Sequence, residues 1–202
     1  MDLVPVTSRI VLRRFTKGDV SGLLALDGNP EVMRFLGPVR SRAEIGASTL
    51  PRFIAFHEGR PGFGYWAAWE RAGDELIGWF GLRPVVPAET AIVDWPDAPP
   101  GEVAVAELGY RLRRSVWGRG YGTEGARALV HQAFTGLGVS RVVATTMTVN
   151  TASRRVLEKA GFRQARTVHL QWPDPLPGNE LGEAEYELRR DDWLASGGLN
   201  RA

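Results

Sequence analysis

The sequence predicts one α/β domain, in which helices flank a mixed sheet of about seven strands. First, its 202 residues fit a single globular domain, and no internal repeat or low-complexity linker divides them. Second, a strand and short helices come before antiparallel strands. Third, helices then alternate with strands up to a final pair of strands. This order of elements excludes a doubly wound parallel sheet.

The first third of the chain predicts one strand and three helices. Residues 8–15 are rich in branched side chains and favour a strand. Capping patterns predict a helix over 16–26 and the start of another at 29–31. A fuller capping box opens a helix over 41–58, which we expect to be disturbed at Pro51.

The middle of the chain predicts a hairpin, a long loop and a strand. Aromatic and aliphatic residues at 62–70 and 75–83 flank a short turn and favour paired strands. Five prolines and no clear period at 84–101 predict a long loop, and such loops tend to be functional. The next predicted strand covers 103–113.

The last part alternates helices with strands. Apolar residues on one face predict a helix over 123–137, and a near-continuous β-branched run predicts a buried strand over 140–147. Gly161 ends a predicted helix over 150–160. The remaining predicted strands are 162–172 and 184–190, separated by acidic turns at 173–182.

Composition excludes several classes of protein. With 44% hydrophobic and 24% charged residues, the chain is neither disordered nor fibrous. It has no cysteine, so we expect no disulfide, thiolate metal site or cysteine nucleophile, and the three scattered histidines show no metal-ligand spacing. No long apolar run or secretory signal is present, so the sequence predicts a soluble cytoplasmic protein that does not engage a membrane.

The charges are segregated along the chain. A net charge of +2 is too small for the basic stripe of a nucleic-acid-binding protein, so we expect no nucleic-acid partner. Residues 111–127 contain five arginines and one acid, whereas 84–102 contain four acids and no base. Residues 173–187 contain five acids and no base. This pattern predicts a protein that holds an anion in one place and a cation nearby.

A glycine-rich turn joins the strand at 103–113 to the following helix. Gly118, Gly120 and Gly122 let the backbone approach an anion, and free N–H groups at the helix start favour phosphate. Arg113, Arg114 and Arg119 would add positive charge. The turn lacks the Gly-Lys-Ser/Thr ending of a P-loop and the spacing of a Rossmann fingerprint. A simple reversal of chain direction is the structural alternative.

A second block, Asn150-Thr-Ala-Ser-Arg-Arg-Val-Leu-Glu-Lys-Ala-Gly-Phe162, follows the buried strand. Together the two blocks resemble the GNAT superfamily of N-acyltransferases, and in detail the RimJ/RimL group, which acetylates protein N-termini. The runs at 29–36, 107–110 and 185–193 support this resemblance, which covers about residues 8–194 within one domain over 1–202.

The resemblance implies that acetyl-CoA is the acyl donor, without a metal. Its pyrophosphate would lie on the first block and its pantetheine beside the second. The residues expected to bind it are Tyr110, Arg111, Leu112, Trp117, Gly118, Arg119, Gly120, Tyr121, Gly122, Thr123, Asn150, Arg154 and Arg155. A backbone N–H near Tyr110 would polarise the donor carbonyl, as the resemblance implies.

Glu107 and Ser153 are the candidate catalytic residues. Glu107 matches the acidic base of many GNAT enzymes, and an amine of pKa ~10 must lose a proton before it attacks. Many GNAT enzymes carry a tyrosine as general acid where this chain has Leu157, and Ser153 matches the serine proposed for that role in the RimJ/RimL group. An ion-paired strand glutamate and a helix-capping serine are the structural alternatives.

Leu157 is one departure from the pattern of the superfamily, and Trp117 is a second. Trp117 stands where the wider superfamily often has Gln or Arg, although Trp-Gly is common in the RimJ/RimL group. Trp66, Trp69 and Trp79 are interpreted as core residues in preference to an acceptor pocket.

The sequence thus predicts acetyl transfer to a primary amine, with a protein N-terminus as the expected acceptor, by direct attack in a ternary complex. A polyamine or aminoglycoside acetyltransferase, a succinyltransferase and a non-catalytic acyl-CoA-binding module remain open. The loop at 84–101 forms either a substrate wall or the contact of a homodimer.

An acidic rim is expected on the acceptor side. Its candidate members on the long loop are Glu89, Asp94, Asp97 and Glu102. Those after Trp172 are Asp174, Glu180, Glu183 and Glu185. In the resembled fold both segments lie opposite the nucleotide, so such a rim would attract a cationic acceptor.

Overall fold

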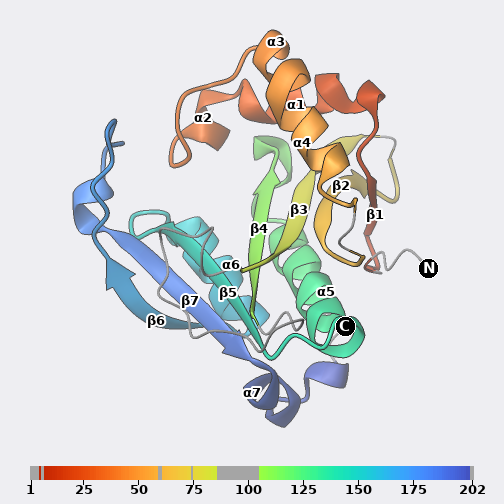
Figure 1. Cartoon of the computed structure of the whole chain (residues 1–202), viewed down its shortest axis with the longest axis vertical. Coiled ribbons are helices and arrows are strands. Elements are labelled where there is room, and N and C mark those ends of the chain that lie inside the picture. Colours follow the sequence, from red (N-terminus) through yellow and green to blue (C-terminus); the bar gives the residue numbers. More distant parts are fainter. Residues whose placement is uncertain (1–4, 6, 59–60, 74, 86–104, 201–202) are drawn as a thin grey trace.

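A seven-stranded mixed sheet forms the centre of the protein. The computed structural model describes residues 5, 7–58, 61–73, 75–85 and 105–200. In these residues the strand order is β1-β2-β3-β4-β5-β7-β6, with only β4 and β5 parallel (Figure 1). The strands are β1 (Ile10–Arg14), β2 (Gly64–Glu70), β3 (Leu76–Pro84), β4 (Val105–Leu112), β5 (Arg141–Met147), β6 (Arg163–Val168) and β7 (Glu183–Arg189). The predicted fold class is confirmed.

Short helices follow β1, as the capping patterns predict. They are η1 (Lys17–Asp19), α1 (Val20–Asp27), α2 (Pro30–Met33), α3 (Arg42–Glu44), the π-helical segment η2 (Ile45–Thr49) and α4 (Leu50–Ala55). The helix predicted over 41–58 is therefore divided. Its π-helical stretch ends at Thr49. Pro51, which has no backbone N–H, lies just after that stretch, where the regular hydrogen-bond pattern is already altered.

The longer helices lie in the second half of the chain. They are α5 (Tyr121–Gly136), α6 (Thr151–Ala160) and α7 (Arg190–Ala195), with one-turn helices η3 (Arg114–Val116), η4 (Asn179–Leu181) and η5 (Gly198–Asn200). Helix α5 begins two residues earlier than predicted, directly after the glycine turn. Strand β6 ends at Val168, four residues before the predicted end at Trp172. The loop predicted at 84–101 lies outside the described residues from position 86 onwards.

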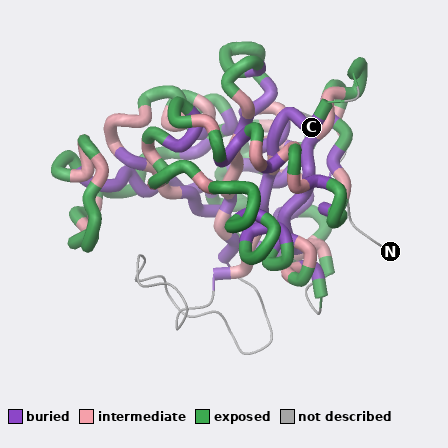
Figure 2. The backbone as a smooth tube through the Cα atoms, turned by 90° about the horizontal axis from the view of Figure 1, so that it is seen from above, coloured by how far each residue is buried: buried purple, intermediate pink, exposed green. Residues whose placement is uncertain are grey.

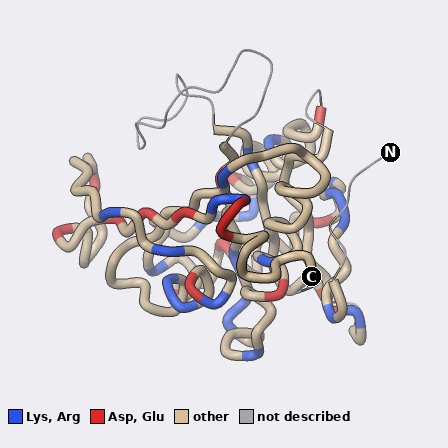
Figure 3. Tube along the Cα trace, turned by 90° about the horizontal axis from the view of Figure 1, so that it is seen from below, with Lys and Arg blue, Asp and Glu red and all other residues tan. Residues whose placement is uncertain are grey.

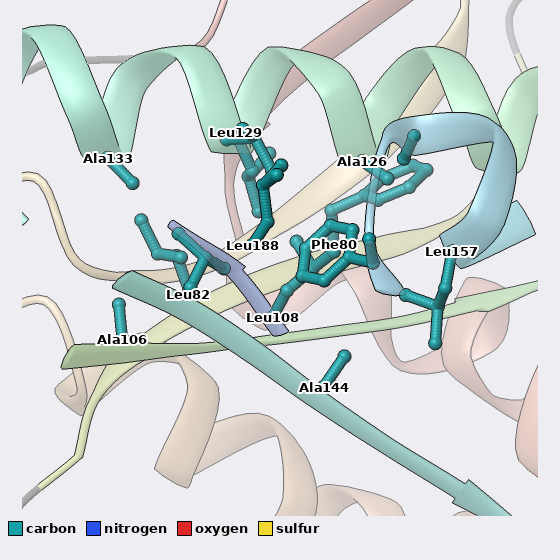
Figure 4. Packing of buried hydrophobic residues seen from close by; sticks show 14 of the residues in the cluster. Phe80, Leu82, Ala106, Leu108, Ala126, Leu129, Ala133, Ala144, Leu157 and Leu188 are labelled. Atoms are coloured by element: carbon teal, nitrogen blue, oxygen red, sulfur yellow. The ribbon is translucent and has the colours of Figure 1, made fainter. Parts of the chain in front are cut away.

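Alternating side chains of the sheet enter two main cores. The buried stretches of the chain run through the middle of the molecule, and the exposed ones lie at its periphery (Figure 2). Helix α5 and the sheet enclose the larger core, where Phe80, Leu82 and Leu108 meet Leu129 and Ala133 (Figure 4). The smaller core lies between the opposite face of β2 and β3 and the helices α1–α4, which meet it with Leu23, Ile45 and Phe53. Each helical layer thus buries its apolar stripe against one side of the sheet.

Strands β4 and β5 pair over only three residues before they separate. The last pair is Glu107 with Val143, although both strands continue to Leu112 and Met147 (Figure 1). We call the unpaired stretch beyond Glu107 and Val143 the β4–β5 divergence.

Among the described residues, every helix is too short or too polar to span a membrane.

Candidate active site

Glu107 lies at the last pair before the β4–β5 divergence. Its side chain is 30% exposed, and its Oε2 forms an ion pair with Arg83, directly opposite on β3. Strand alternation puts Glu107 on the same face as Gly109 and Arg111, as predicted, and this is the face that α1–α4 partly cover. Arg83 was not predicted as a site residue, because the register of two strands 24 residues apart is not visible in the sequence.

Aromatic side chains pack on the same face beside Glu107. Tyr65 is buried and stacks on Phe53 with ring centroids 4.1 Å apart, and Trp79 meets the edge of both rings. Burial raises the pKa of Tyr65, so its phenol stays protonated at neutral pH. A Cβ built on Gly109 would lie 3.8 Å from the Trp79 ring. Trp79 thus joins the helical layer and borders the strand that carries Glu107.

Backbone N–H groups of β4 point into the divergence. The N–H of Arg113 donates to Ile77 of β3 at 2.8 Å, so odd-numbered residues of this stretch direct their backbone groups toward β3. Even-numbered residues direct theirs to the other edge. Because pairing with β5 ends at Glu107, the N–H of Tyr110 points into the divergence. A donor at this edge is suited to a developing negative charge on a carbonyl oxygen.

The hydroxyls of Tyr110 and Ser153 meet next to the same divergence. Their oxygens are 3.0 Å apart, and the contact joins β4 to the first turn of α6. The Tyr110 side chain is on the face opposite Glu107, where its ring lies 5.8 Å from that of Phe80. Burial raises the pKa of Tyr110 to about 12. The residue expected to bind the cofactor therefore also presents a protonated phenol.

The start of α6 is capped by its predicted first residue. The side chain of Asn150 accepts a 3.1 Å hydrogen bond from the N–H of Ser153, and Gly161 ends the helix with a φ of 101°. Ser153 therefore does not cap the helix; its hydroxyl faces Tyr110. Leu157, at the position where many GNAT enzymes have tyrosine, is a buried core residue.

The glycines of the turn before α5 have different roles. Gly118 and Gly120 adopt φ values of 74° and 86°, which disfavour any residue with a Cβ. A Cβ on Gly122 would lie 3.2 Å from Val156 of α6, so this glycine lets two helices approach. Helix α5 is sixteen residues long, and the free N–H groups at its N-terminus are suited to bind a phosphate group.

The stretch of chain that contains the glycine turn, the divergence and Glu107 matches a known family. A model of the acetyltransferase (GNAT) domain matches residues 9–163. The chain belongs to the GNAT acetyltransferase family. It is thus an acyl-CoA-dependent N-acyltransferase, and relatives of its GNAT domain bind CoA or acetyl-CoA as co-substrate.

Two curated relatives cover most of the GNAT domain. FsC-acetyl coenzyme A-N(2)-transacetylase of Aspergillus fumigatus is 35% identical over 172 residues, which are 85% of this chain and 69% of that protein. The uncharacterised N-acetyltransferase YoaA of Bacillus subtilis is 30% identical over 159 residues, 78% of this chain and 81% of that protein.

Solved structures share the fold at low identity. Aminoglycoside acetyltransferase AAC(6')-Ib, in complex with coenzyme A, is 22% identical with a TM-score of 0.69, over 93% of this chain and 98% of that one. Spermidine N-acetyltransferase from Vibrio cholerae, in complex with CoA and spermine, is 15% identical with a TM-score of 0.67, over 92% and 98%. At these identities the likeness concerns the fold alone.

The arginines expected to serve the cofactor are largely engaged with acids in this GNAT domain. Arg111 forms an ion pair with Asp27, which is 1% exposed at the end of α1. The other pairs are Arg113 with Glu75, Arg114 with Glu31 and Arg119 with Glu70. Basic and acidic segments accordingly lie interspersed (Figure 3). Four of the five arginines in the basic run at 111–127 are thus paired with acids distant in the chain.

Trp117 and the residues after it fix the turn. The indole Nε1 donates a 2.8 Å hydrogen bond to the carbonyl of Leu112, which ties the turn to the end of β4. The phenol of Tyr121 contacts Glu70 of β2, and Thr123 lies partly exposed in the first turn of α5. Trp117 thus has a local structural role where other members have Gln or Arg.

The two arginines of α6 differ in their surroundings. Arg154 donates to the Tyr186 hydroxyl at 3.0 Å, to the Thr148 carbonyl and to Gln164, so its side chain joins α6 to β6 and β7. These contacts favour a structural role over the predicted contact with the nucleotide. Arg155 is exposed on the helix.

The predicted acidic rim is only partly present. Glu183 and Glu185 are buried within β7, and Glu185 forms an ion pair with Arg166 on β6, so neither belongs to a rim. Burial also raises the pKa of Glu183. Asp174 and Glu180 are exposed. The four acids at positions 89, 94, 97 and 102 lie outside the described residues.

His57 and His131 each pack against the ring of a tryptophan. His57 is buried and contacts the carbonyl of Tyr65 at 2.8 Å, while His131 packs against Trp193. Trp66 is a core residue. Among the described residues, no group of three or more histidines, aspartates or glutamates is placed to hold a metal ion.

The glycine turn provides a first test. Gly120→Ala is expected to weaken CoA binding about tenfold, equivalent to about 1.4 kcal/mol, because the turn would lose the backbone conformation that directs its N–H groups. Gly138→Ala is the matched control, since Gly138 has a φ of 68° and open space around it, at the far end of α5. Calorimetry with CoA should separate the two variants. Equal affinities would remove the turn from the binding site.

Proposed function

We propose that this enzyme transfers an acetyl group from acetyl-CoA to a primary amine by direct attack, with Glu107 as the base. The observation that carries the proposal is the arrangement around the divergence. Glu107 borders it on the face toward α1–α4, the N–H of Tyr110 points into it, and the Tyr110–Ser153 hydroxyl pair lies on the other face.

The chain's own groups account for each charge in the reaction. Bound acetyl-CoA would supply a thioester carbonyl. Glu107 would take the proton that the ammonium of the acceptor must lose before it attacks, directly or through water. The second N–H proton, which the nitrogen loses as the amide forms, would leave to solvent by the same route. The Tyr110 N–H would stabilise negative charge on the carbonyl oxygen as the C–N bond forms. The hydroxyl of Ser153 would face the sulfur as the C–S bond breaks.

A small-molecule amine is the acceptor that we favour. The support comes from the transacetylase of Aspergillus fumigatus, which is 35% identical and whose name specifies an N(2) acetylation of FsC. Aminoglycoside and spermidine acetyltransferases share the fold, at lower identity. A protein N-terminal amine is the second candidate, because the runs at 29–36 and 107–110 resemble the RimJ/RimL group.

Release of free CoA thiol distinguishes the two acceptors. The purified enzyme should be assayed with acetyl-CoA and succinyl-CoA against small polyamines, aminoglycosides and peptides with free N-termini. We expect kcat/KM to be highest with acetyl-CoA and a small amine. A peptide preferred over every small amine would establish the second candidate, and absence of thiol release across the panel would contradict the proposed chemistry.

A further inference from the structure

Neither helix capping nor core packing requires the contact between the hydroxyls of Tyr110 and Ser153. The α6 cap is supplied by Asn150, and the Tyr110 ring already packs beside Phe80 without need of its hydroxyl. The two hydroxyls nevertheless lie 3.0 Å apart, whereas the Tyr110 hydroxyl is 3.4 Å from the Ser153 carbonyl. The shorter contact is the side-chain one.

A serine hydroxyl has one proton, and the direction of its O–H bond depends on which hydrogen bonds the oxygen accepts. If Tyr110 donates to Ser153 Oγ, the serine proton must point elsewhere. Ser153 sits in the first turn of α6, beside the divergence, so that proton is available to a group bound there. A serine without such a partner is free to rotate toward the backbone of the preceding turn.

Resting on the proposed function, we propose that Tyr110 is a positioning residue that donates to Ser153 and thereby directs the Ser153 hydroxyl toward the thiolate of the departing CoA. The pair acts by hydrogen bonding. A thiol has a pKa of ~8.5, which is lower than the pKa of an alcohol or of this phenol. The thiolate is therefore too weak a base to remove a proton from either hydroxyl. The C–S electron pair therefore stays on sulfur as a hydrogen-bonded thiolate, and the proton that Glu107 removed leaves through solvent.

Two further features favour negative charge at this place. The N-terminal end of α6 carries the positive end of a ten-residue helix dipole. Burial keeps the Tyr110 phenol protonated, since its pKa is raised to about 12, so the donor persists throughout the working pH range. Leu157 supplies no hydroxyl at the usual tyrosine position, and the phenol on β4 compensates through Ser153.

The pKa of the CoA thiol in the binary complex tests the inference without any acceptor. Hydrogen bonds to a thiolate favour its charged form, so the bound thiol should titrate about one unit below its free value of ~8.5, as followed by thiolate ultraviolet absorbance. Ser153→Ala should remove most of the shift, leaving only the part due to the α6 helix dipole, and Tyr110→Phe should reduce the shift. The double variant should match Ser153→Ala, because the tyrosine acts only through the serine.

Turnover should follow the same order. One pKa unit corresponds to a factor of ten, so we expect kcat to fall about tenfold in Ser153→Ala and somewhat less in Tyr110→Phe. The loss should be constant over pH 6–9, since neither hydroxyl titrates there. The Kd of CoA should stay within about threefold of wild type, because the pair acts on the thiolate and the neutral thiol predominates at neutral pH.

Tyr186→Phe is the matched control. The Tyr186 hydroxyl also joins a strand to α6, donating to Glu158 and accepting from Arg154, each at 3.0 Å. If the Tyr110 contact only fastened α6, both Tyr→Phe variants would lower Tm and leave the thiol pKa unchanged. That result, or a larger effect of Tyr110→Phe than of Ser153→Ala, would overturn the inference. CoA bound normally with an unshifted thiol would refute it while leaving the base chemistry of Glu107 intact.

Discussion

Glu107→Gln should reduce kcat by about 10²–10⁴ while CoA affinity stays unchanged, because a general base is lost and no binding group is removed. Glutamine is nearly isosteric and can still accept a hydrogen bond from Arg83, so the strand register is preserved. Steady-state kinetics with a good acceptor, together with CoA calorimetry, measure the two effects separately.

The effect of Glu107→Gln on kcat/KM should depend on pH. As pH rises toward the amine pKa of ~10, the fraction of neutral acceptor grows and the base is needed less. The ratio of wild-type to variant kcat/KM should therefore shrink from pH 6 to pH 9. Glu70→Gln is a suitable control, since Glu70 is a strand glutamate that also pairs with an arginine and has 24% side-chain exposure. Equal kinetics for wild type and Glu107→Gln across this range would leave Glu107 as an ion-paired strand residue.

Gly125→Ala should lower the free energy of unfolding by about 2 kcal/mol, because the new methyl group overfills the contact between α5 and β3. A Cβ at this position would lie 2.2 Å from the ring of Phe80, which is fully buried and cannot withdraw. Better helix propensity offsets only about 1 kcal/mol of this strain. Thermal unfolding should show Tm falling by roughly 6 °C.

Gly46→Ala separates packing from helix propensity. Gly46 lies exposed in the π-helical segment η2, and a methyl group added to it would have open space within 4 Å. Its replacement should therefore leave stability unchanged or raise it by about 0.5 kcal/mol.

CoA affinity should also fall in Gly125→Ala, since α5 carries the glycine turn at its N-terminus. A Gly125→Ala protein as stable as Gly46→Ala would show that α5 moves freely on the sheet.

Features that depend on neighbouring residues could be predicted from the sequence alone. The capping boxes at Thr16 and Ser41, the stop at Gly161 and the alternation that separates Glu107 from Tyr110 all depend on neighbours within a few residues. Such features are set by backbone conformation and side-chain period, which short stretches of sequence record directly. The seven strands and the family followed from the same local patterns.

The partners of charged and polar side chains depended on the tertiary structure. Arg83 opposes Glu107 through a strand register, and Asp27 reaches Arg111 from a helix 84 residues away. The pairing with Asp27 engages one member of an arginine run that appears free in the sequence, and the burial of Glu183 and Glu185 removes two acids from the predicted rim.

The hydroxyl contact between Tyr110 and Ser153 shows the same limit most clearly. The sequence identifies both residues as site candidates. Their 3.0 Å separation depends on the tertiary structure, in which the first turn of α6 meets β4 beyond its last pair with β5. Residue type and local period are properties of the chain. Distances between segments result from how a whole core packs, because a side chain finds its partner only when both elements bury their apolar faces together.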